Sequence, residues 1–185
     1  LCITLYVMTP YLAVLLKRNK RWSGGGVEEV DDQSKPVVTP MTVEEKLKLI
    51  TKDKTREVII TTATKGFNAM LFNWLCSVQQ FHLLDQVLIY VPSEDFAQEL
   101  ITKYRIPAHQ IHAEEDKSLK IGEEVHYRQL DYQILMVKRT QFINRVLKMG
   151  HTILLADNDA VWLKNPLQYI HQKYVNTETD FDLIA

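Results

Sequence analysis

The chain has 185 residues, of which 46% are hydrophobic, 24% charged and 9% aromatic, a composition typical of one globular domain. It excludes a disordered tail, a collagen-like repeat and a small scaffold held by disulfides. The 22 Lys and Arg residues nearly balance the 23 Asp and Glu residues, and the net charge of −1 argues against a nucleic-acid partner. The two cysteines, Cys2 and Cys76, show neither a disulfide framework nor metal-ligand spacing.

Residues 1–22 are predicted to be a membrane anchor with a basic flank. The first 16 residues carry no charge, and KRNKR follows them. As a helix, such a run rises about 24 Å, slightly less than a bilayer core requires. The first residue is Leu rather than Met, which predicts a sequence that begins inside a longer chain and an anchor that is incomplete. The alternative is a buried helix or strand of the domain. The polar, glycine-containing residues 23–56 argue against it, because they are typical of a stem or linker.

From residue 57 onward, β-branched runs alternate with helical patterns, and this part is predicted to be the folded domain, 57–185. Thr42 and Glu45 have the spacing of a capping box, which predicts a short helix within the stem over 43–54. Strands are predicted at 58–62, 87–91, 152–156 and 181–185, with a short strand at 110–112 as an alternative to a loop. Helices are predicted at 69–82, 94–104, 126–149 and from Pro166. The alternation predicts an α/β fold with a mainly parallel sheet flanked by helices.

Two polar loops follow predicted strands of this sheet, Thr61–Asn68 and Asp157–Asp159. Right-handed crossovers place the carboxyl ends of parallel strands on one edge of the sheet, where the ligands of such folds bind. The two loops are therefore the candidate functional site.

The string ILLADNDAVWL places two carboxylates, Asp157 and Asp159, directly after an apolar strand. Side chains at i and i+2 of a strand point the same way, so the two carboxylates can converge on one hard divalent cation. One chemistry that uses this arrangement is a metal bridging the diphosphate of a nucleotide-sugar. A second is a haloacid-dehalogenase-like phosphatase, in which Asp157 is the nucleophile. The structural alternative is an ordinary Asx turn at Asp157 with a solvated Asp159.

Three segments, 58–78, 87–100 and 127–167, give the chain a resemblance to a known family. The most specific is KRTQFINRVLKMGHTILLADNDAVWLKNPL. Together they resemble the nucleotide-diphospho-sugar transferases, Golgi glycosyltransferases related to plant xylosyl- and arabinosyltransferases. The resemblance implies a GT-A-like fold with a Rossmann-like nucleotide-binding half, cut short here at the C-terminus. It also implies an enzyme that uses a UDP-sugar donor, Mn²⁺ or Mg²⁺, and a glycan or protein acceptor.

The resemblance further implies a single-pass type II protein of the Golgi membrane with a lumenal catalytic domain. The basic flank alone would favour the opposite orientation. By the same resemblance, Asp157 and Asp159 bind the metal. The implied nucleotide-binding residues are Thr61, Thr62, Ala63, Asn68, Arg128, Lys138, Asp157 and Asn158.

Several of these residues have a structural alternative. Thr64 or Asn68 could cap the next helix, and Lys138 and Arg128 could be solvated surface. Trp162 is expected to be a core anchor beneath the loop rather than a substrate contact. A non-catalytic nucleotide-binding module remains a third alternative to the transferase and the phosphatase.

Overall fold

The computed structural model describes residues 41–51, 56–114 and 130–175. The predicted anchor over 1–22, most of the stem, Arg128 and the predicted strand at 181–185 lie outside the described residues. Within the described ranges, no helix combines the length and apolar character needed to cross a membrane.

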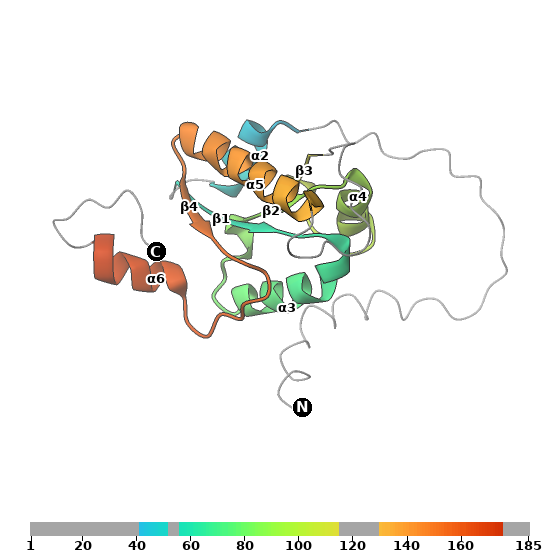
Figure 1. The fold of residues 1–185 in the computed structure, drawn as a ribbon. Helices are drawn as coiled ribbons and strands as arrows, with labels where there is room; N and C mark the ends of the chain where they lie inside the picture. The colour runs from blue at the N-terminus through green and yellow to red at the C-terminus, as the bar shows by residue number, and fades with distance from the viewer. Residues whose placement is uncertain (1–40, 52–55, 115–129, 176–185) are drawn as a thin grey trace, which may run out of the picture. The chain divides into compact units, whose positions relative to one another are not determined.

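The strands and helices alternate along the chain, as the hydrophobic pattern predicts (Figure 1). The strands are β1 (Glu57–Thr62), β2 (Val87–Val91), β3 (Ile111–Ala113) and β4 (Thr152–Leu155). The α-helices are α2 (Val43–Ile50), α3 (Asn68–Gln79), α4 (Glu94–Thr102), α5 (Leu130–Lys148) and α6 (Pro166–Ile170). Short 3₁₀ turns precede α3, β2 and β3, and the first of them is η1 (Lys65–Phe67). A π-helical turn, His171–Val175, follows α6.

The four described strands form one parallel sheet in the order β3-β2-β1-β4. The chain adds β2 and β3 on one side of β1 and then crosses over through α5 to place β4 on the other side. Val58 pairs in register with Ile153 of β4, and Ile60 pairs with Leu88 of β2. The strand order therefore reverses beside β1, and such a switch point is where parallel α/β sheets bind ligands. The predicted α/β class with a parallel sheet is confirmed.

Helices cover both faces of the sheet, which explains why β1 and β2 read as continuous apolar runs. On one face, α3 and α4 pack around Ile59 and Ile89. On the other face, α2 and α5 pack around Val58, Ile60 and Leu88 (Figure 1). All five strand residues are almost fully buried, and each contributes roughly 1.5–3 kcal/mol through removal from water.

Local signals set most of the helix ends. The capping box of Thr42 and Glu45 is formed, and Ser93 accepts a hydrogen bond from Phe96 N at the start of α4. Asn165 caps α6, with Pro166 in the first turn. Gly150 follows α5 with φ +83°, a conformation that favours glycine after a helix. The helix expected over 43–54 ends at Ile50, with Thr51 as its C-cap.

Candidate functional site

The loops that follow β1 and β4 meet at the carboxyl edge of the sheet. Asn158, in the loop after β4, donates a hydrogen bond from Nδ2 to the carbonyl oxygen of Thr62 at 2.9 Å. Ala156 N donates to the carbonyl of Ile60, which extends the β1–β4 pairing into the loop. The structure thus brings together the two loops that the sequence predicts to form the site.

Three threonines at the end of β1 and in the loop after it have buried hydroxyls. The side chain of Thr61 is fully buried, and that of Thr64 is 5% exposed. Within the described residues, the hydroxyls of Thr61, Thr62 and Thr64 have no hydrogen-bond partner. A buried hydroxyl without a partner costs about 1–3 kcal/mol, so each of these three hydroxyls is a candidate for a contact with a bound ligand.

The capping alternative for this loop is wrong. Thr64 precedes η1 but makes no side-chain hydrogen bond to it. The residue before α3 is Phe67, and Asn68 is already the first residue of that helix. The hydroxyl of Thr64 is therefore not used by helix capping. Ala63 is buried, and its amide donates to the carbonyl of Tyr90 at the end of β2.

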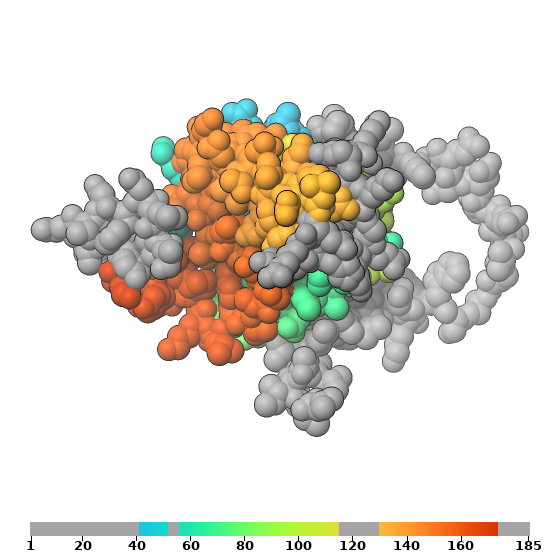
Figure 2. Space-filling view, viewed as in Figure 1, coloured from blue at the N-terminus to red at the C-terminus, as the bar shows by residue number. Residues whose placement is uncertain are grey.

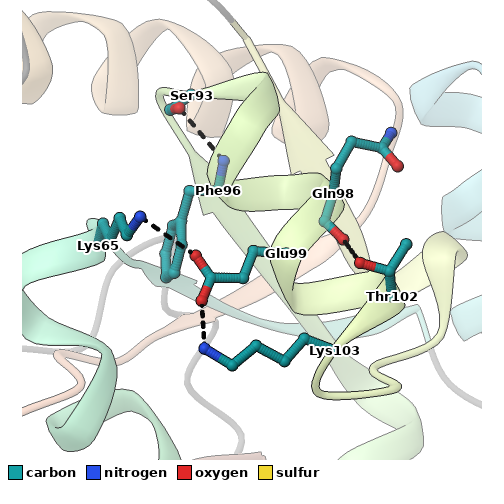
Figure 3. Close-up of polar contacts among 7 residues, drawn as sticks. All are labelled: Lys65, Ser93, Phe96, Gln98, Glu99, Thr102 and Lys103. Atoms are coloured by element: carbon teal, nitrogen blue, oxygen red, sulfur yellow. Dashed lines mark hydrogen bonds and ion pairs between the residues drawn. The ribbon is translucent and has the colours of Figure 1, made fainter. Parts of the chain in front are cut away.

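An ion pair fixes the same loop to α4. Lys65 lies 3.4 Å from Glu99, which also pairs with Lys103 one turn further along α4 at 2.8 Å (Figure 3). The hydrogen bond from Lys103, helped by Lys65, lowers the pKa of the Glu99 carboxyl. Glu99 thus pairs with Lys65 from this loop as well as with Lys103 from its own helix.

The two carboxylates after β4 are accessible. The Asp157 side chain is 71% exposed, and Asp159 is also exposed. Both lie in a turn that is closed by a backbone hydrogen bond, which Ala160 N donates to the carbonyl oxygen of Asp157 at 3.4 Å. The Asp157 side chain accepts a hydrogen bond from Arg139 Nη2 at 3.1 Å.

Arg139 is the site residue that sequence reasoning missed. It lies on α5 next to Lys138, and its side chain is only 16% exposed. The space-filling view shows α5 beside the segment that follows β4 on one face of the molecule (Figure 2). The Lys-Arg pair is visible in the sequence, but only the rotation of α5 decides which of the two cations reaches Asp157. Lys138 is half-buried on the same helix.

Trp162 anchors the carboxylate loop on α3, as expected for a core residue. Its ring packs edge-on against Trp74, with centroids 5.5 Å apart. Its backbone amide donates to the hydroxyl of Ser77 at 3.1 Å. The loop after β4 is thus held to β1 through Asn158, to α5 through Asp157 and to α3 through Trp162.

The donor set fits a hard divalent cation only in part. Asp157 and Asp159 provide oxygen ligands of the kind that Mg²⁺ and Mn²⁺ prefer. Across the ranges that the structure describes, no three His, Cys, Asp or Glu side chains gather into a metal-binding group. These ranges therefore offer at most a two-carboxylate platform, which leaves coordination positions for phosphate oxygens and water.

The model of the nucleotide-diphospho-sugar transferase family matches residues 82–185, more than half of the chain and the part that contains the carboxylate pair. The chain belongs to this family. This membership favours the transferase over the phosphatase, two chemistries that the D-x-D spacing alone does not separate.

Curated relatives in Arabidopsis thaliana are similar over much of the chain. Beta-arabinofuranosyltransferase RAY1 is 23% identical over 137 residues, which cover 74% of this chain and 25% of the relative. UDP-D-xylose:L-fucose alpha-1,3-D-xylosyltransferase MGP4 is 26% identical over 132 residues, 69% of this chain and 34% of the relative. A further UDP-D-xylose:L-fucose alpha-1,3-D-xylosyltransferase is 23% identical over 184 residues, 97% of this chain and 47% of the relative. The chain thus spans between a quarter and half of the length of these relatives. No solved structure matches it.

Proposed function

We propose that this chain carries the nucleotide-binding half of a glycosyltransferase that moves a sugar from a UDP-sugar to a glycan or protein acceptor. The observation that carries the proposal is the meeting of the β1 and β4 loops at the switch point of the sheet, in a member of the nucleotide-diphospho-sugar transferase family. The names of two relatives include UDP-D-xylose as the donor, which makes UDP-xylose the first donor to test.

The loop after β1 is proposed to bind the nucleoside. The hydroxyls of Thr61, Thr62 and Thr64 can donate to and accept from the uracil and ribose, which matches a set of groups that lack partners among the described residues. Ala63 belongs to the same loop, and Asn68 is the first residue of the helix that follows it. Asn158 contributes by tying this loop to the carboxylate loop.

The loop after β4 is proposed to hold the diphosphate end of the donor through Asp157, Asp159 and a divalent cation, Mn²⁺ or Mg²⁺. When bound, this cation supplies positive charge that stabilises the leaving nucleoside diphosphate. Arg139 and Lys138 on α5 add cationic donors near this end, with Arg128 as a further candidate outside the described residues. Guanidinium groups suit phosphate oxygens because they donate in a fixed fork.

Residues 1–22 are proposed to anchor the protein in the Golgi membrane as a type II protein, with residues 23–56 as stem and the domain from residue 57 in the lumen. The support is the uncharged run of residues 1–16 followed by KRNKR, together with the family resemblance. Expression of the intact protein with a reporter at each end, followed by protease protection of Golgi vesicles, tests this orientation.

The proposed reaction is tested by measuring UDP release from UDP-xylose and other UDP-sugars, and UDP binding by calorimetry, with Mn²⁺ and with EDTA. We expect Mn²⁺-dependent UDP binding that is lost in Asp157→Asn and Asp159→Asn. The matched control is Asp85→Asn, an exposed Asp on the 3₁₀ turn before β2, which is expected to bind as the wild type does. Binding without turnover of any donor would support the non-catalytic module. A phosphoryl group trapped on Asp157 would support the phosphatase and overturn the proposal.

A further inference from the structure

Ser77 occupies an unusual place for a serine. It lies inside α3, is 2% exposed, and its hydroxyl donates to the carbonyl of Trp74 at 2.7 Å. Serine is a modest helix former, and a hydroxyl bonded to its own helix gives little stability in an apolar layer. The same oxygen also accepts the backbone amide of Trp162, at 3.1 Å. The second bond explains why a hydroxyl is useful here, because it gives the backbone amide of Trp162 a partner.

The helix that carries Ser77 begins at the other half of the site. Its first residue, Asn68, directly follows the loop with the buried hydroxyls of Thr61 and Thr64. Ser77 lies nine positions after Asn68 in this helix, a rise of about 14 Å. The ring of Trp162 also packs edge-on against Trp74, which is fully buried on the same helix. Helix α3 thus runs from the loop after β1, which is proposed to bind the nucleoside, to Ser77, which binds the loop after β4 through Trp162.

We propose that Ser77 is a positioning residue that sets the place of Asp157 and Asp159 relative to the nucleotide loop. This inference rests on the proposed function. Ser77 touches neither ligand. It acts through Trp162, which follows the second carboxylate by only three positions, so a shift of the Trp162 amide moves the carboxylates. The hydrogen bond from Trp162 to Ser77 fixes the position of the loop after β4 along the axis of α3. The Trp74–Trp162 contact fixes the distance of this loop from the helix.

The test is Ser77→Ala in the full chain, compared with Cys76→Ala, a half-buried neighbour on the same helix. Alanine favours the helix more than serine does, so Ser77→Ala is expected to fold. We expect the amide of Trp162 to exchange its hydrogen at least tenfold faster by NMR. We expect affinity for UDP alone to stay within twofold of wild type and affinity for Mn²⁺ in the presence of UDP to fall about tenfold. Ser77→Thr, which keeps the oxygen, should restore most of this affinity, and Cys76→Ala should change neither binding constant.

The outcomes separate the two proposals. If wild type binds both UDP and Mn²⁺ and Ser77→Ala binds them equally well, the positioning role is overturned and the proposed function stands. Equal losses of UDP and Mn²⁺ affinity, in step with a lower melting temperature, indicate a purely structural serine and also overturn it. If wild type binds neither ligand, both the proposed function and this inference fail.

Discussion

Asn158 donates from its side-chain amide to the carbonyl oxygen of Thr62, a contact of 2.9 Å between residues 96 positions apart. It lies between the two carboxylates of the D-x-D string, and its partner is the last residue of β1. This hydrogen bond therefore joins the end of β1 directly to the turn that carries Asp157 and Asp159.

Removing this bond tests its contribution. Asn158→Ala is expected to lower the free energy of unfolding by about 1 kcal/mol, because the Thr62 carbonyl loses a partner. Mn²⁺-dependent UDP binding should weaken about fivefold as the two loops separate, a loss of about 1 kcal/mol. Urea denaturation and calorimetry measure the two effects. Asn144→Ala, at an exposed position of α5, is the control. Unchanged UDP binding in Asn158→Ala would show that the Asn158–Thr62 hydrogen bond has no role in the site.

Thr61→Val distinguishes a ligand-binding hydroxyl from a merely buried one. Valine has nearly the shape of threonine, and the hydroxyl it replaces is fully buried and lacks a partner within the described part of the chain. Stability is expected to rise by about 1 kcal/mol, because an unsatisfied polar group is removed. UDP affinity is expected to fall by roughly five- to tenfold, since a hydrogen bond to the ligand is worth about 1 kcal/mol or slightly more.

Thr102→Val is the control for Thr61→Val. Thr102 is exposed on α4, where its hydroxyl donates to the carbonyl of Gln98 at 2.7 Å (Figure 3). This change should leave UDP affinity at the wild-type value. A Thr61→Val variant that is more stable and binds UDP as well as wild type would remove Thr61 from the site.

Arg139 is expected to compete with a divalent cation for Asp157. Its Nη2 lies 3.1 Å from Oδ1, so a metal on that oxygen meets a positive charge already in place. Arg139→Met is expected to strengthen Mn²⁺ binding in the absence of nucleotide about fivefold, which corresponds to about 1 kcal/mol for a pair with one exposed partner. Titration of Mn²⁺ followed by electron paramagnetic resonance measures this. Lys148→Met removes one charge from an exposed position of the same helix and controls for net charge. Weaker Mn²⁺ binding in Arg139→Met would contradict the competition.

His112 makes stability depend on pH. It stacks on Phe142 with centroids 4.6 Å apart, and its Nε2 lies 3.8 Å from Glu114. Burial, with smaller contributions from the charges of Lys46 and Arg145, lowers the pKa of His112 from 6.5 to about 4. Between these values the unfolded chain binds a proton that the folded chain does not, so stability rises with pH across this window and falls on acidification.

The expected loss is about 2 kcal/mol of unfolding free energy between pH 7 and pH 5, measured by urea denaturation. His112→Phe keeps a ring against Phe142 and cannot titrate. Its loss of unfolding free energy between pH 7 and pH 5 should therefore be smaller than that of wild type by this amount. His82→Asn, at an exposed position with φ 57° that asparagine tolerates, should keep the wild-type difference. An equal pH dependence in His112→Phe and wild type would assign the effect to other groups.

The sequence predicts the elements well where local physics decides them. β2 is observed over 87–91 as predicted, because a strand buried on both faces is a continuous apolar run. The caps at Thr42 and Ser93 form as predicted, since each depends on side chains within one turn. The meeting of the two polar loops also follows, because parallel strands with right-handed crossovers share one carboxyl edge.

The details of the site depend on contacts between distant residues, which one sequence does not reveal. β4 lies beside β1 in the sheet, and no local sequence signal in either strand determines this order. Arg139 reaches Asp157 because packing of Leu135 and Phe142 fixes the rotation of α5. The tether of Trp162 to Ser77 joins residues 85 positions apart. Each of these contacts depends on the tertiary packing, so the local sequence pattern around either residue does not predict it.

The strand order also dictates when the site can exist during synthesis. β1 pairs with β4 through Val58 and Ile153, with most of the domain between them in sequence. At typical rates of translation, roughly 5–20 s pass between the emergence of the two strands. Throughout that interval the more apolar half of the sheet exposes the edge of β1, a surface prone to pair with other chains. The loop with Asp157 and Asp159 is therefore put in place by the same pairing that covers this edge, so a nascent chain completes the proposed site only when the edge of β1 is no longer open.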